Sequence, residues 1–336
     1  MPENVTPLIV LVLVLVLAAE FVNGWTDAPN AIATVVSTRV LSPGAAVVMA
    51  VVLNAVGALS GTAVAATIGK GFVQPQDVTA PTVGAAMVGI VVWSTFAWRL
   101  GLPTSESHAL VSGITGAVLA TAGPGKLLSD GWVKTGQGLV FSSLFGFGAA
   151  MLLMVAIYWG FRRVPPALVR AVFSRAQIAS AAFMAFSHGS NDAQKFMGAF
   201  SLTLVAGGLL PQFEVPLWVI LLCASTMGVG TAFGGWRIIR TLGLRVTRLE
   251  PVHGFAAETG AATVIEVASR LGIPVSTTHT ISTSIMGVGA TRRFSAVRWG
   301  VAQEMVLAWI ITFPACAAIA WAVATLFKQL GVLPPA

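Results

Sequence analysis

Residues 21–36 read FVNGWTDAPNAIATVV, and residues 99–116 read RLGLPTSESHALVSGITG. Both motifs return later in the chain, as FSHGSNDAQKFMGAF at 186–200 and RLGIPVSTTHTISTSIMG at 270–287. Polar motifs that recur in the same order within apolar sequence indicate an internal duplication. The alignment pairs Asp27 with Asp192, Asn30 with Lys195, Pro103 with Pro274, Ser105 with Ser276 and His108 with His279. We therefore expect a duplicated membrane unit whose chemistry lies where the two copies meet.

The composition excludes a soluble globular chain. Of the 336 residues, 56% are hydrophobic and only 9% are charged, and the mean hydropathy is +0.86. Soluble domains carry about 25% charged residues, whereas an apolar run of about 20 residues can span a bilayer. Such runs recur along this chain, for example at 45–66 and 139–160. The sequence predicts an all-α, polytopic transmembrane helical bundle in the cell membrane.

The net charge of +7 does not indicate nucleic-acid binding, because the arginines cluster between apolar runs, at 161–175, 234–250 and 291–298. This is the pattern that the positive-inside rule gives to cytoplasmic loops. If residues 161–175 are cytoplasmic, 13 of the 19 Lys and Arg residues lie inside the cell. This uneven distribution of Lys and Arg predicts that both termini lie outside the cell.

The chain divides into an N-terminal repeat (1–160), a cytoplasmic linker (161–174) and a C-terminal repeat (175–336). The expected crossings are 7–40, 44–67, 80–98, 103–121 and 136–160, then 175–209, 215–233, 252–269, 274–290 and 298–326. Five crossings per repeat would invert the second repeat relative to the first. We expect the first segment of each repeat to be interrupted, around 24–29 and 189–192, giving broken helices or re-entrant hairpins.

Two carboxylates, Asp27 and Asp192, fall at membrane depth. A charged side chain there costs at least about 2.5 kcal/mol unless it is paired or faces water, so these residues are functional candidates. An interrupted helix would add backbone carbonyls to a carboxylate as oxygen ligands for a cation. Asn30, near Asp27, offers a further neutral oxygen. The alternative is a structural hydrogen bond between helices.

The second motif pair predicts an anion site. In each copy a proline is followed by hydroxyl residues, and proline at the start of a helix leaves the next backbone N–H groups free. Those groups, the helix dipole and the hydroxyls favour an oxyanion. The hydroxyl residues are Ser105, Ser107, Ser276, Thr277 and Thr278. Two such half-sites could close around one tetrahedral anion, although ordinary Ser/Thr capping accounts well for either motif alone.

Two positions break the symmetry between the copies. Lys195 replaces the amide of Asn30 with a fixed positive charge, which should exclude sodium from that half and stand in for it. Glu106 adds a carboxylate to the anion pocket, where burial and a neighbouring anion favour the neutral form. Glu106 is therefore the candidate carrier of a coupling proton, while sodium could still occupy the Asp27/Asn30 half. The carboxyl group should also prefer phosphate, which can donate hydrogen bonds to a carboxylate, over fully ionised sulfate, which cannot.

The motifs resemble those of the inorganic phosphate transporter (PiT) family, in its bacterial branch. The resemblance runs nearly end to end and rests on NGWTDAPNAIATVVSTR (23–39), HGSNDAQKFMG (188–198), GIPVSTTHT (272–280) and MGVGATRR (286–293). It implies a secondary carrier with inverted repeats that moves phosphate with a coupling cation, sodium or protons depending on the branch. The family's Asp and Asn positions correspond to Asp27, Asn30, Asn191 and Asp192, and its hydroxyl motifs to Ser105, Ser107, Ser276, Thr277 and Thr278. Thr26 stands where bacterial relatives often have His, and Glu106 where a hydroxyl residue is common.

The leading hypothesis is a symporter that imports inorganic phosphate by alternating access, with protons favoured over sodium. The expected substrate-binding residues are Ser105, Glu106, Ser107, Ser276, Thr277, Thr278, Asn191 and Lys195. The expected coupling residues are Asp27, Asn30, Asp192 and Glu106, supported by Thr26, Gln194, His108 and His279. The expected partners are phosphate, a coupling cation and the bilayer, and a homodimer is left open.

Three further functions compete with this hypothesis. A carrier for sulfate or another tetrahedral oxyanion is the nearest alternative. An intramembrane metal-dependent hydrolase would need ligands at a spacing such as H-E-x-x-H, which the sequence lacks. An ion channel would not need two donor-rich half-sites beside two carboxylates. We therefore expect no enzymatic activity, no catalytic residue, no resident metal and no cofactor.

Overall fold

The computed structural model describes residues 6–333 and is built from α-helices, with no β-strand in that range. The N-terminal half contains α1 (Pro7–Ser37), α2 (Pro43–Ala58), α3 (Ala63–Gly71), α4 (Ala80–Leu100), α5 (Glu106–Thr121) and α6 (Ser129–Phe161). The C-terminal half contains α7 (Pro166–Ala206), α8 (Leu217–Phe233), α9 (Trp236–Arg240), α10 (Pro251–Arg270), α11 (Thr277–Arg292) and α12 (Trp299–Gln329). The two halves therefore present matched helices in the same order. α7 begins inside the stretch expected as a linker, so only residues 162–165 separate the halves.

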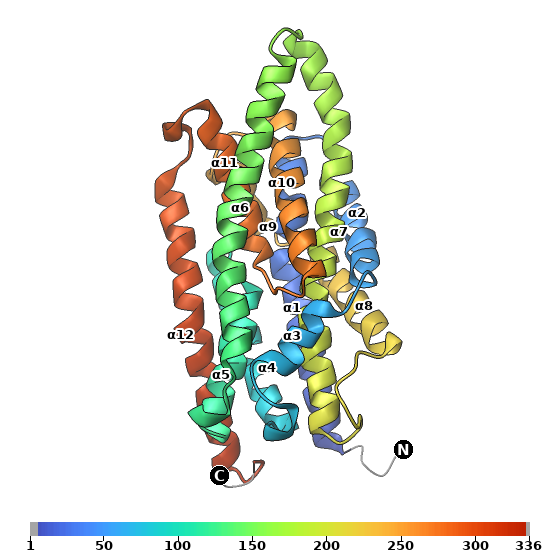
Figure 1. Cartoon of the computed structure of the whole chain (residues 1–336), viewed down its shortest axis with the longest axis vertical. Coiled ribbons are helices and arrows are strands. Elements are labelled where there is room, and N and C mark those ends of the chain that lie inside the picture. Colours follow the sequence, from blue (N-terminus) through green and yellow to red (C-terminus); the bar gives the residue numbers. More distant parts are fainter. Residues whose placement is uncertain (1–5, 334–336) are drawn as a thin grey trace.

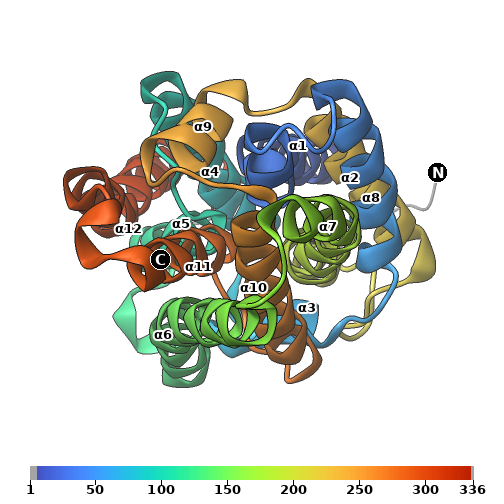
Figure 2. The same cartoon turned by 90° about the horizontal axis from the view of Figure 1, so that it is seen from above.

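Several helices of each half pack on helices of the other half. α2 packs on α7 and α8 packs on α1, while α6 covers α10 and α11 and α12 covers α4 and α5 (Figure 2). The start of α1 and the end of α12 lie at one end of the molecule, and the turn between α6 and α7 lies at the other (Figure 1). The matched helices thus form one interlocked bundle.

The expected interruptions of the two long Asp-bearing helices are wrong. α1 continues through Gly24 and Pro29, and α7 continues through Gly189. These glycines instead allow close approach between helices, because a Cβ at Gly24 would collide with the Met227 carbonyl of α8, and one at Gly189 with the Asn54 carbonyl of α2. Small residues at a helix contact let the backbones come together in a membrane.

The breaks lie in the next segment of each half. α2 and α3 meet at a bend of 69°, and α8 and the 236–245 segment meet at 62°. A second interruption separates α4 from α5 and α10 from α11, at the two proline motifs. α5 and α11 are 16 residues each, about 24 Å long, which is short of a ~30 Å hydrocarbon core. Each pair is a helical hairpin, and the proline motifs of the two turns, residues 103–105 and 274–276, are buried in the bundle.

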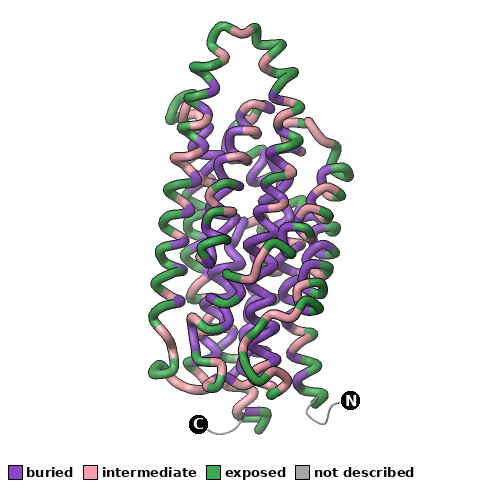
Figure 3. The backbone as a smooth tube through the Cα atoms, turned by 45° about the vertical axis from the view of Figure 1, so that its right-hand side comes forward, coloured by how far each residue is buried: buried purple, intermediate pink, exposed green. Residues whose placement is uncertain are grey.

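The outer surface suits a bilayer. Four helices are long and apolar enough to span it, or up to six if each bent pair counts as one span, which is fewer than the ten expected crossings. Large apolar side chains face outward along α6 and α12, such as Leu144 and Leu152 on α6 and Ile310 on α12. Buried residues concentrate along the central axis (Figure 3). The polar motifs identified in the sequence lie within this buried centre.

Candidate functional site

The two hairpin turns meet at the centre of the bundle. Ser105 and Ser276 are the N-caps of α5 and α11, and their Oγ atoms accept hydrogen bonds from the backbone N–H of His108 (3.4 Å) and His279 (3.2 Å). The two histidine rings lie edge to face with their centroids 4.6 Å apart. Ser107 Oγ donates to the Val275 carbonyl across the contact, at 2.8 Å. The paired motifs are therefore in contact. Both serines also cap the N-terminus of a helix, as ordinary Ser/Thr capping predicts.

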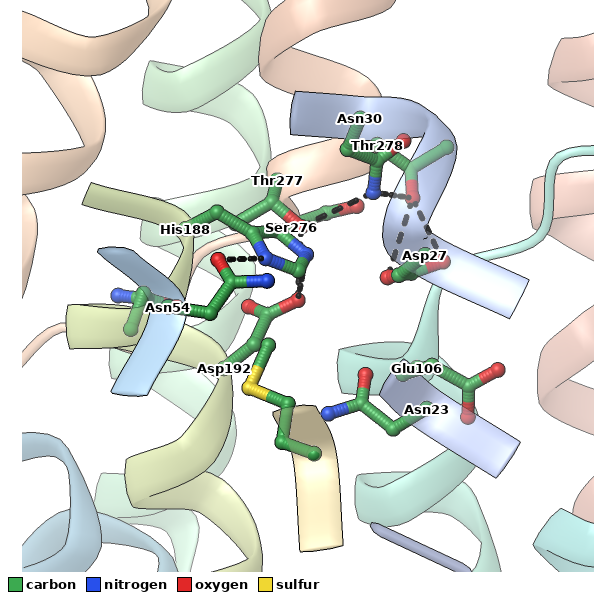
Figure 4. A network of polar contacts seen from close by, with 12 residues as sticks. Asn23, Asp27, Asn30, Asn54, Glu106, His188, Asp192, Ser276, Thr277 and Thr278 are labelled. Carbon is green, nitrogen blue, oxygen red and sulfur yellow. Dashed lines mark hydrogen bonds and ion pairs between the residues drawn. The ribbon is translucent and has the colours of Figure 1, made fainter. Parts of the chain in front are cut away.

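One carboxylate of the centre is fully paired. Asp192 Oδ1 lies 2.5 Å from Lys195 Nζ, and its Oδ2 lies 3.2 Å from His188 Nε2. The Thr277 hydroxyl donates to the same Oδ2 at 2.9 Å (Figure 4). His188 is held from its other side, where Nδ1 lies 3.1 Å from Asn54 Oδ1. Asp192 and His188 have no exposed surface and Lys195 is 1% exposed, so this ion pair is shielded from water.

The matching carboxylate of the first half is held more weakly. The Thr278 hydroxyl lies 3.4 and 3.5 Å from the two oxygens of Asp27. Asn30 Nδ2 donates to the hydroxyls of Thr278 (2.9 Å) and Thr277 (3.3 Å), so both threonines connect Asn30 to a carboxylate (Figure 4). Asn30 Oδ1 is buried and has no hydrogen-bond partner within the described chain. This half retains an amide oxygen and a carboxylate that could bind a cation.

The two carboxylates share one site. Asp27, His188 and Asp192 each offer a ligand atom, and these atoms lie within 4.8 Å of one another. Three such groups could hold a metal ion, but the Lys195 ammonium already contacts Asp192 and supplies a positive charge there.

Glu106 lies at the edge of this centre. Its Oε1 accepts from the Thr26 hydroxyl at 3.1 Å, and Thr26 directly precedes Asp27 in α1. Its Oε2 is buried without a hydrogen-bond partner among residues 6–333. No salt bridge in that range includes Glu106. If all three carboxylates are ionised, the centre holds three negative charges against one lysine.

Two expected site residues face away from the carboxylates. Asn191 Nδ2 donates to Ser269 Oγ of α10 at 2.9 Å, and Gln194 Oε1 accepts from the Val64 N–H at the start of α3, also at 2.9 Å. Both contacts lie beside a cavity of about 400 Å³ that Gln194 and Ser269 help to line. These residues join α7 to α3 and α10 at the side of the central cluster.

The sequence interpretation did not select His188 or Asn54. His188 precedes Asp192 by four positions in α7, a spacing that places both side chains on one helix face and could have identified it. Asn54 is a lone amide in the apolar helix α2, and only the packing of α2 on α7 brings it to His188.

Comparisons with known proteins agree with this architecture. The model of a family described as the phosphate transporter family matches residues 23–168 and 161–320. A probable low-affinity inorganic phosphate transporter of Rhizobium meliloti is 46% identical over 93% of this chain and 94% of its own. One of Bacillus subtilis is 39% identical over 93% of this chain and 95% of its own. A solved structure, the sodium-dependent phosphate transporter, superimposes with a TM-score of 0.90 at 24% identity and covers 97% of this chain and 100% of its own. The chain belongs to the phosphate transporter family.

Proposed function

We propose that the protein imports inorganic phosphate across the cell membrane by cation-coupled alternating access. The observation that carries the proposal is the buried centre, which holds Asp27, Asp192 and Glu106 with a single lysine, paired to Asp192, at the N-termini of α5 and α11. An anion entering a buried site that already has excess negative charge needs compensating positive charge. The charge balance therefore favours entry of phosphate together with a cation.

The donors around the centre suit a tetrahedral oxyanion. α5 and α11 point their N-termini at the site, and helix N-termini favour anions through free N–H groups and the helix dipole. Ser105 and Ser276 accept backbone hydrogen bonds, which leaves each hydroxyl proton available to a ligand. The Lys195 ammonium adds a charged donor from α7. Together the hairpins and α7 would bind phosphate from three directions.

We favour the proton as the coupling ion. Glu106 has an oxygen without a partner in the described chain and no cation beside it, so a proton is the simplest charge that could neutralise it. Sodium remains the competing ion for the first half, where Asp27 and the Asn30 amide oxygen supply ligands of the kind that hard cations prefer. Lys195 occupies the corresponding place in the second half.

The exchanged packing supports alternating access by two inverted repeats. Each hairpin is covered by a long helix of the other half, α12 over α4 and α5 and α6 over α10 and α11. Movement of one hairpin and its cover against the other could expose the centre to either side. The distribution of arginine favours an orientation with the α6–α7 turn in the cytoplasm and both ends of the chain outside.

Uptake into proteoliposomes tests the proposal. Labelled phosphate and labelled sulfate are supplied in parallel, with sodium and pH gradients imposed separately. We expect concentrative phosphate uptake when the outside is acidic, without a sodium requirement. Uptake that follows the sodium gradient alone would reject the proton. Preferential uptake of sulfate would reject phosphate as the substrate.

A further inference from the structure

A second cavity, of about 400 Å³, lies between the end of α4 and the segment after the α8–α9 bend. Four arginines line it, Arg99, Arg237, Arg240 and Arg245, together with Leu100 and Trp236, and its described lining includes no acidic residue. α9 sits at the periphery of the bundle beside α4 (Figure 2). The following π-helical turn, Thr241–Arg245, packs against the end of α1 at Ala33 and Ser37. The cavity is therefore near the C-terminal end of α1.

Specific contacts connect the segments on either side of the cavity. Arg237 donates to the Arg99 carbonyl and lies over the Trp98 ring, 5.1 Å from its centroid. Thr241 Oγ1 donates to the Gly101 carbonyl at 3.0 Å, and Gly101 has the positive φ of 71° that ends α4. These contacts join the end of α4 to the 236–245 segment.

The positive charge of this cavity is poorly compensated. Arg245 lies 3.5 Å from Glu304, but both side chains are about half exposed, where a salt bridge is weak. Arg99 and Arg240 make no salt bridge within residues 6–333. All four arginines are exposed, so water screens much of their mutual repulsion, and a bound anion would offset the remainder.

The counterpart of this cavity in the duplicated fold lacks the excess charge. It is the cavity lined by Gln194 and Ser269, beside the α2–α3 bend. Its arginine, Arg270, opens the RLGIP motif as Arg99 opens RLGLP, and it bonds Glu266 at 2.9 Å. The repeated fold therefore forms two matched cavities, each lined by residues of both halves, and of these two only the one at Arg99 gathers four arginines.

We propose that the arginine-lined cavity binds a phosphate group, separately from the central site. Guanidinium groups bind phosphate oxygens in pairs, which makes arginine the preferred residue for this ligand. The group could belong to free inorganic phosphate or to the headgroup of an anionic lipid. Exposed Leu100 and Trp236 at the rim suit a lipid tail and a membrane interface, and basic pockets between membrane helices bind such headgroups.

The test uses the full chain in neutral detergent. The variant Arg99→Gln/Arg240→Gln removes two cavity charges and leaves Arg237, which fastens α4 to α9. The matched control, Arg163→Gln/Arg175→Gln, removes two exposed charges near the α6–α7 turn, outside the cavity. Native mass spectrometry counts bound phosphatidylglycerol, with phosphatidylcholine as the neutral comparison. Equilibrium binding of labelled phosphate, without lipid, counts phosphate ions per chain.

The wild type and the control should bind the cavity ligand equally, and the cavity variant should bind it at least about tenfold more weakly. A loss of phosphatidylglycerol alone assigns a lipid headgroup, and a loss of one phosphate per chain assigns the free ion. Equal binding by all three proteins, or an equal loss in the control, overturns the proposal. The single variant Arg240→Gln serves if the double variant does not fold. None of these counts depends on transport.

Discussion

Lys195 and Asp192 form an ion pair with no more than 1% of either side chain exposed, whereas the matched positions in the first half hold Asn30 and Asp27. The duplicated centre is thus asymmetric in charge. One carboxylate has a permanent cation, and the other has hydroxyl and amide neighbours. The first half is therefore the place where an exchangeable cation has most to contribute.

Replacing the lysine should destabilise the protein strongly. Lys195→Met leaves the Asp192 charge buried without its cation, which costs about 3–5 kcal/mol, and it should abolish phosphate uptake. The thermal unfolding midpoint in detergent measures the first effect. The double variant Asp192→Asn/Lys195→Met should recover most of the stability but not the uptake. Recovery of both would show that the pair is structural only.

Removing a capping hydroxyl at a hairpin turn should weaken phosphate binding. Ser105→Ala and Ser276→Ala each lose an N-cap, worth about 1 kcal/mol of stability. Each also loses a hydrogen bond to a charged ligand, worth about 1.5–3 kcal/mol, or roughly 10- to 150-fold in affinity. Phosphate titration of the purified variants measures the affinity. Ser225→Ala, at an exposed position on α8, is the control. Unchanged affinity in both cap variants would place the phosphate elsewhere.

Neutralising Glu106 should uncouple uptake from the pH gradient. Glu106→Gln mimics the protonated carboxyl permanently, so phosphate could still bind but an acidic exterior should no longer drive its accumulation. Uptake into proteoliposomes at several imposed pH gradients gives the comparison. Glu258→Gln is the matched control, because Glu258 is also buried but accepts hydrogen bonds from Thr34, Gln177 and Ser180. The wild-type pH dependence in Glu106→Gln would rule out the assigned role.

The close contact between α2 and α7 should not tolerate a methyl group. A Cβ at Gly57 would collide with the Phe186 carbonyl, so Gly57→Ala should lower stability by about 1–3 kcal/mol. At Gly148 on α6 an added Cβ meets nothing within 4 Å. Gly148→Ala should instead be neutral or stabilising by up to about 1 kcal/mol, because alanine favours helix. Equal unfolding midpoints for the two variants would contradict the packing argument.

The sequence was sufficient to predict the helical membrane fold and the meeting of the paired motifs. A polar motif that is repeated within apolar sequence rarely arises except by duplication, and Ser107 indeed bonds the carbonyl of Val275 from the opposite copy. The position of the breaks was not predictable in the same way. Glycine both permits a helix break and permits close packing, and only the neighbours of Gly24 and Gly189 distinguish the two uses.

The contacts of individual polar residues also could not be predicted from the sequence. Asn191 and Asp192 are adjacent, yet successive residues of a helix point about 100° apart, so Asn191 bonds α10 while Asp192 meets Lys195. Which face turns toward the centre depends on packing between segments far apart in the chain. The pairing of His188 with Asn54 has the same origin.

The exchange of packing partners has a consequence for biosynthesis. α4 and α5 leave the ribosome early, but the helix that covers them, α12, is made only after α6 to α11. Until α12 is inserted, the face of the α4–α5 hairpin that α12 will cover is in contact with lipid or an insertion factor. Contacts between distant segments slow folding, and here the α4–α5 hairpin gains its cover only after α12 has been translated. A chain that stops before residue 299 would leave the first hairpin uncovered, even with the whole of the N-terminal half present.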